Sequence, residues 1–149
     1  MSVLAQNKKA YFDYEILETY EAGIVLIGQE VKAIKTGHIN LKGSYVVIKN
    51  QELFLIGANI PPYQPKNAPK DYQPERSRKL LLRKTEIKSL IGKSKQKGLT
   101  LIPLKMYTKK GKIKLLFGLA KGKKEYDKRE KIKKREFERQ KEKLLKEKI

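Results

Sequence analysis

The sequence has 149 residues, and its 36 lysines and arginines against 16 aspartates and glutamates give a formal net charge of +20. It has no cysteine and one histidine, which excludes a disulfide scaffold, a thiolate metal site and a cysteine nucleophile. So large an excess of positive charge favours a polyanionic partner, with nucleic acid the first candidate and an anionic membrane surface the second.

The first strands and the first helix are expected before residue 38. Residues 12–20 mix aromatic and β-branched residues with a period near two, which indicates a strand, and residues 21–23 supply a turn. Residues 24–27 form a short apolar run, typical of a strand buried on both faces. Residues 29–36 predict a short helix that ends at Gly37 and carries Lys32 and Lys35 on one exposed face.

Two hairpins and a second helix are expected in the rest of the body. Residues 44–49 and 53–57 flank a three-residue turn, and residues 99–107 and 113–117 flank a Lys-Gly turn. Pro103 places part of its strand at an edge or a bulge. Between the hairpins, residues 61–74 form a proline-rich surface loop, and residues 87–91 predict a helix with Thr85 as its cap.

Many short strands with one or two helices predict a mainly β fold. For a basic protein the leading candidate is a small closed β barrel of the oligonucleotide-binding type with short helices. Periodicity alone leaves a β sandwich open as the alternative. The domain division that we predict is an RNA-binding barrel at residues 1–122 and a basic tail at residues 123–149.

The tail differs in composition from the body. Six of the last 29 residues of the chain are hydrophobic, against 52 of the first 120, so the tail has no face broad enough to pack on the barrel. Acid-before-base pairs at i, i+4 are present, for example Glu130 with Lys134, but each adds only a few tenths of a kcal/mol. We therefore expect a tail that is disordered when free and helical against a polyanion.

The sequence offers little for catalysis or cofactor binding. His38 lies beside a predicted turn, with no nucleophile near it in the sequence. Asp13, Glu15, Glu18 and Glu21 alternate along a predicted strand instead of converging on a metal. No phosphate-binding loop with a Ser or Thr is present. We expect no enzyme activity, no cofactor and no metal.

Basic clusters remain as the candidate binding sites. Asn7, Lys8 and Lys9 precede the first strand, and residues 76–97 hold nine cations against the single acid Glu86. Such a density of like charge is costly without an anionic partner. Tyr residues at 11, 14, 20, 63 and 72 add faces on which bases could stack.

A run at the start of the tail resembles the SsrA-binding protein family, also called small protein B. The run is GLAKGKKEYDKR at residues 118–129. Further matches occur in the same order along the chain: NKKA at 7–10, YEAGI at 20–24, GQEVKAI at 28–34, SYV at 44–46, GANI at 57–60 and RKLLL at 78–82. The resemblance covers nearly the whole chain and departs mainly in the loop after residue 61 and beyond residue 129.

The resemblance implies a fold and a function. The fold would be an oligonucleotide-binding barrel that binds the tRNA-like domain of transfer-messenger RNA. The complex would enter stalled ribosomes for trans-translation, with the charged RNA delivered by elongation factor Tu. The tail would contact the ribosome and ribosomal RNA as a helix in the empty message channel. The protein would be a cytoplasmic monomer with no membrane partner and no catalysis of its own.

The resemblance and the basic clusters together give the candidate site residues. The residues expected to bind RNA are Asn7, Lys8, Lys9, Tyr14, Glu21, Lys32, Lys35, Arg76, Arg78, Lys79 and Leu82, although core packing is at least as good an explanation for Leu82. The residues expected to act at the ribosome are Gly122, Lys123, Lys124, Asp127, Lys128, Arg129 and Phe137. Phe137 stands where the family has an aromatic residue.

Other functional classes stay open on composition. A ribosomal protein or an initiation-factor-like barrel that binds ribosomal RNA directly fits the charge equally well. An RNA-modifying enzyme lacks an acid/base or cofactor constellation, and a membrane-surface protein lacks a broad apolar face in the tail.

Overall fold

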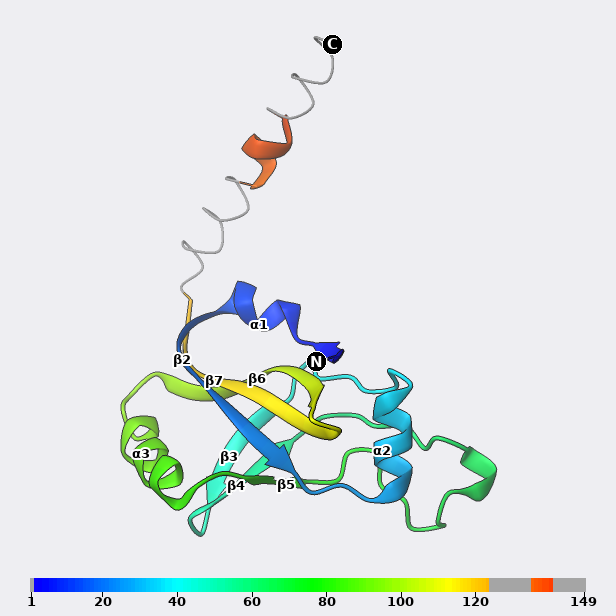
Figure 1. Cartoon of the computed structure of the whole chain (residues 1–149). Coiled ribbons are helices and arrows are strands. Elements are labelled where there is room, and N and C mark those ends of the chain that lie inside the picture. Colours follow the sequence, from blue (N-terminus) through cyan, green and yellow to red (C-terminus); the bar gives the residue numbers. More distant parts are fainter. Residues whose placement is uncertain (1, 124–134, 141–149) are drawn as a thin grey trace.

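The strands pair with one another in a single sheet that closes on itself. The computed structural model describes residues 2–123 and 135–140 (Figure 1). The strands are β1 (Ser2–Gln6), β2 (Tyr14–Ile24), β3 (Tyr45–Lys49), β4 (Glu52–Ile56), β5 (Arg78–Leu81), β6 (Leu99–Lys109) and β7 (Lys112–Gly122). Their order is β1-β6-β3-β4-β5-β2-β7, all pairs are antiparallel, and β6 also pairs with β7. Strands β2 to β7 therefore form a closed ring, which confirms the barrel over the sandwich.

Short helices cover different parts of the barrel. They are α1 (Lys8–Asp13), α2 (Gly28–Lys35), the 3-10 turn η1 (Pro65–Asn67) and α3 (Lys84–Ser94). In Figure 1, α2 and α3 lie on opposite sides of the strands and α1 lies near the amino terminus. Lys93 of α3 forms an exposed ion pair with Glu18 of β2 at 2.8 Å, and Leu90 of α3 is buried in the core.

Both predicted hairpins are present, and each is joined by a two-residue turn. Asn50 and Gln51 have φ of 51° and 62°, and Lys110 and Gly111 have φ of 51° and 76°. Two consecutive residues with positive φ make the type I′ turn, whose twist matches that of the flanking strands. One residue of each turn, Asn50 or Gly111, adopts this backbone at low cost, and the two-residue turns set the register of β3–β4 and β6–β7.

The core lies inside the ring of strands. Phe117, Met106, Leu115, Leu53 and Leu55 are fully buried. Tyr20 stacks on Phe117 with ring centroids 5.6 Å apart. The strands β2 and β7 approach closely at Gly118, where an added Cβ would lie 2.9 Å from the Ile16 methyl.

Pro103 marks a bulge in β6, as the sequence predicts. The register with β7 shifts between Pro103 and Lys105. Before the bulge β6 pairs with β3, and after it β6 pairs with β1. The Asn7 backbone N–H donates to the Leu104 carbonyl at 2.8 Å, and the Asn7 side-chain amide donates to the Pro103 carbonyl at 3.0 Å. Asn7 thus satisfies carbonyls that the bulge leaves outside the ladder.

Several predicted boundaries are wrong, each for a physical reason. Residues 21–23 are not a turn, because β2 continues to Ile24 and pairs with β7. Residues 25–27 are not a buried strand, because Val25 and Ile27 are exposed. Residues 12–13 end α1 instead of starting a strand. Thr85 lies inside α3, whose N-cap is Arg83.

Candidate nucleic-acid interface

A shallow groove lies between α2 and the β6–β7 hairpin, and we call it the hairpin groove. Its volume is about 380 Å³, and its lining includes Lys35, Lys112, Lys114, Leu81 and Gly23. Three lysines around an apolar floor make a surface suited to a phosphate chain with exposed bases.

Glu21 stands beside this groove on β2, two residues before Gly23. Its carboxylate accepts hydrogen bonds from the Tyr107 hydroxyl and from Lys109, the latter at 3.4 Å. The bond from Tyr107, together with Lys109 and Lys114, holds the pKa of Glu21 below its usual range. Burial and the nearby carboxylate raise the pKa of Tyr107, so its hydroxyl keeps its proton and donates.

The chemical consequence is a charged acceptor held on a basic surface. The Glu21 side chain is 35% exposed, so one side of the carboxylate faces solvent. A fixed carboxylate accepts from base-edge amino or imino groups or from a 2′-hydroxyl, which a phosphate-binding lysine does not do. The structure therefore places Glu21 with Tyr107, Lys109 and Lys114, and Lys114 also lines the hairpin groove.

A buried ion cluster beneath α2 corrects one predicted site residue. Arg78 is completely buried, and its Nε donates to Glu30 at 2.7 Å while its Nη1 and Nη2 donate to the carbonyls of Ala58 and Pro74, both at 2.8 Å. Every guanidinium nitrogen has a partner inside the protein. The prediction that Arg78 contacts RNA is therefore wrong, and its function is to anchor the proline-rich loop and β5.

Glu30 is the centre of this cluster and links it to α2. It also accepts from Arg76 Nη2 at 2.5 Å and from the Ile27 backbone N–H at 3.0 Å. Burial acts to raise the pKa of Glu30, but the hydrogen bonds from Arg76, Ile27 and Arg78 outweigh it and hold that pKa low. Arg76 is thus engaged with Glu30, with part of its side chain in solvent, while Lys32 and Lys35 of α2 are exposed as predicted.

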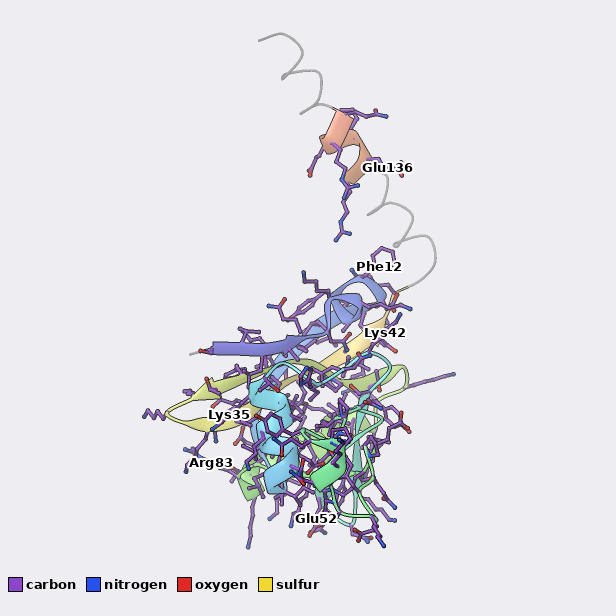
Figure 2. The ribbon with its side chains drawn as sticks, turned by 90° about the vertical axis from the view of Figure 1, so that its right-hand side faces the viewer. Phe12, Lys35, Lys42, Glu52, Arg83 and Glu136 are labelled. Atoms are coloured by element: carbon purple, nitrogen blue, oxygen red, sulfur yellow. The ribbon has the colours of Figure 1, made fainter. Side chains whose placement is uncertain are left out.

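A second groove, which we call the α1 groove, has a volume of about 400 Å³. It brings together the predicted residues Asn7, Lys9 and Tyr14 with Lys42 and Tyr45, which the sequence analysis did not select. Figure 2 shows Lys42 at the end of the barrel where Phe12 of α1 lies. Lys8 and Lys9 are exposed, whereas Asn7 is buried and its amide binds Pro103. Asn7 therefore positions the start of α1, which carries the two lysines.

Strand β5 separates outward from inward residues. Lys79 points out and pairs with Glu52 at 3.3 Å. Leu82 is half-buried and packs against the core, whereas Leu81 is 52% exposed and lines the hairpin groove. The alternation of residues 78–81 would have identified Leu81 as the outward residue, had this short segment been predicted as a strand.

Only part of the tail set falls on residues that the structure describes. Gly122 ends β7, and Lys123 donates from its backbone N–H to the Asp13 carbonyl at 2.9 Å and from Nζ to the Tyr11 carbonyl at 3.1 Å. Residues 135–140 are helical, and Phe137 on them is 67% exposed. The predicted residues outside the described ranges are Lys124, Asp127, Lys128 and Arg129.

The described residues contain neither a cluster of metal ligands nor a helix that could span a membrane. Within residues 2–123 and 135–140, no three His, Asp or Glu side chains gather as a metal site would need. Across those ranges, no helix has the length and apolar character to cross a bilayer.

Comparisons with known proteins agree with one another. The family model described as SmpB protein matches residues 4–147. The SsrA-binding protein of Ralstonia nicotianae is 54% identical over 97% of this chain and 98% of its own length. The SsrA-binding protein of Thermosynechococcus vestitus is 49% identical over 98% and 96%. A solved structure described as "tmRNA-SmpB: a journey to the center of the bacterial ribosome" is 48% identical, with a TM-score of 0.68 over 84% of this chain and 87% of that one.

Proposed function

This chain belongs to the SmpB protein family, and on that premise we propose that it binds transfer-messenger RNA and acts in trans-translation on stalled ribosomes. The observation that carries the proposal is the agreement over nearly the whole length with SsrA-binding proteins. The lysine-lined hairpin groove beside Glu21 supplies matching chemistry.

The barrel is the part that binds the tRNA-like domain of the RNA. Lys32 and Lys35 contact phosphates, and Glu21 accepts hydrogen bonds from bases or ribose in a looped-out region. The support is the carboxylate that Tyr107 fixes beside the lysine-lined hairpin groove, because binding to phosphates alone does not require an acidic side chain. Lys9 and Tyr14 at the α1 groove, with the neighbouring Lys8 of α1, offer a second set of contacts.

The tail acts at a later stage, on the ribosome. Residues 123–149 hold 13 basic and 7 acidic residues, which suits contact with ribosomal RNA. The protein works as a cytoplasmic monomer without catalysis, and elongation factor Tu reaches it only through the charged RNA.

A binding comparison tests the proposal directly. The full chain is titrated with the tRNA-like RNA and with an unrelated RNA duplex of equal charge at one fixed salt concentration. We expect at least tenfold tighter binding of the tRNA-like RNA. Equal affinity for both, or preferential recovery of ribosomal RNA in a pull-down, would favour a ribosomal-RNA-binding barrel instead.

A further inference from the structure

A third groove, which we call the α3 groove, lies between α3 and β5 on the other side of Leu81. Its volume is about 500 Å³, within the range of small-ligand sites. Leu81, Leu82, Ile87 and Ile91 supply its apolar lining. Lys84 and Lys88 also line it, and so does Gln51 from the β3–β4 turn.

The apolar part of the α3 groove is left open by the fold. Ile87 and Ile91 are four residues apart on α3, so they share one face of the helix. Both are only half-buried, and Leu81 opposite them is half exposed. An open apolar surface of this kind fits the flat face of an unpaired nucleobase.

The cations beside it lack partners. Lys84 and Lys88 are also four residues apart, a spacing at which like charges destabilise a helix. In the described part of the chain, neither lysine has an ion pair, whereas Lys79 and Glu52, which also line the groove, are paired with each other. Phosphate groups would relieve this repulsion. The Gln51 amide both donates and accepts hydrogen bonds, as the edge of a base requires.

We propose that the α3 groove holds an unpaired nucleotide of a bound RNA, with its base on the leucine and isoleucine side chains and its flanking phosphates at Lys84 and Lys88. The proposal rests on the proposed function for its partner class. Leu81 lines both this groove and the hairpin groove. A single strand that crosses β5 therefore passes from one groove into the other.

A fluorescent reporter tests this directly in the full chain, which has no tryptophan. Ile91→Trp places one indole in the groove, and Ile91 is not part of the main core cluster. The control is Val3→Trp, an exposed position on β1 that lines none of the three grooves. Both proteins are titrated with a short oligouridylate and with an RNA duplex of equal length, after melting curves show that each is folded.

We expect the oligouridylate to quench the indole of Ile91→Trp and leave that of Val3→Trp unchanged. Adding Lys84→Gln and Lys88→Gln should weaken this quenching about tenfold and lower the salt slope by about 1.4, since each single-strand phosphate contact contributes about 0.7. Lys95→Gln with Lys97→Gln removes the same charge just beyond α3 and should leave the quenching midpoint within about twofold.

Three results would overturn the proposal. Equal quenching by single strand and duplex would mean that phosphates alone approach the groove. Equal weakening by the two lysine pairs would mean that the binding is unspecific electrostatics. Tighter binding of polyglutamate than of oligouridylate would make the groove a docking site for an acidic peptide. In each case, selective binding of the tRNA-like RNA by the unmodified chain would leave the proposed function intact.

Discussion

Tyr107 is a buried side chain whose one polar atom reaches the surface at Glu21. Its hydroxyl therefore sets the orientation of the carboxylate that we assign to RNA contact. A hydrogen bond to a charged group contributes about 1.5–3 kcal/mol. Part of that contribution is lost from RNA binding when the carboxylate is free to rotate.

Tyr107→Phe should weaken binding of the tRNA-like RNA about tenfold, with no change in the salt slope, because no phosphate contact is removed. The effect should vanish in a Glu21→Ala background, so a double-mutant cycle measures it. Tyr63→Phe, an exposed tyrosine without a hydroxyl bond among the described residues, is the matched control. Additive effects of the two changes would show that Tyr107 acts independently of Glu21.

Substitutions of Lys35 and Glu21 should differ in how they change the salt dependence of RNA binding. Lys35→Gln removes one cation of the hairpin groove and should reduce the salt slope by about 0.9. Glu21→Gln should weaken affinity at every salt concentration with the slope unchanged. Affinities measured across a salt series test both, and a lower slope for Glu21→Gln would contradict its assignment as a base or ribose contact.

At the scale of elements, the Glu30 cluster joins α2, the proline-rich loop and β5 through one buried carboxylate. Since the pKa of Glu30 is lowered by folding, the unfolded chain takes up its proton first. Stability from this group is therefore fully present above the usual value of 4.5 and is lost as the pH falls through the lower folded pKa.

Glu30→Gln should cost about 3 kcal/mol at neutral pH, because it leaves Arg78 buried without its anion. It should also flatten the loss of stability below about pH 4.5. Melting temperatures across the acid range measure both effects. Glu52→Gln is the control, since its exposed pair with Lys79 is worth at most about 1 kcal/mol. An equal loss in both variants would count against the cluster as an anchor.

Sequence periodicity identified the elements with a strong local pattern and missed those that depend on partners. Each hairpin turn holds one residue that accepts positive φ readily, Asn50 or Gly111, between two strand-like segments, so both hairpins were predictable. Strand β5 has four residues and β1 has five, too few for a clear alternation. The cations of residues 76–97 were visible in the sequence. Only the alternation of side chains along β5 shows that Arg78 points inward and Lys79 points outward.

At the scale of the molecule, removal of the tail should separate RNA binding by the barrel from activity on the ribosome. Removing residues 124–149 keeps the contacts of Lys123 with Asp13 and Tyr11. The shortened chain should retain the melting temperature of the barrel and bind the tRNA-like RNA within about tenfold, or 1.4 kcal/mol, while losing activity on stalled ribosomes. Loss of RNA binding itself would place part of the RNA site in the tail.

The folding of the tail on the ribosome stays a prediction. Glu136 lies in the helical segment 135–140, and this segment is exposed. Glu136→Pro should cost about 3 kcal/mol of helix and reduce ribosome activity, with RNA affinity and barrel melting unchanged. Amide exchange on the free chain provides the second measurement, and slow exchange across the tail would contradict folding on binding.

The order of the strands also affects the tendency of the protein to self-associate. In the part of the chain that the structure describes, β1 pairs only with β6, while every other strand has neighbours on both sides. An unpaired strand edge is where chains add to one another in aggregates. Here that edge is five residues long, and Lys8 and Lys9 follow it after Asn7. Lengthening β1 with apolar residues should therefore promote self-association more than any equal change on β2 to β7.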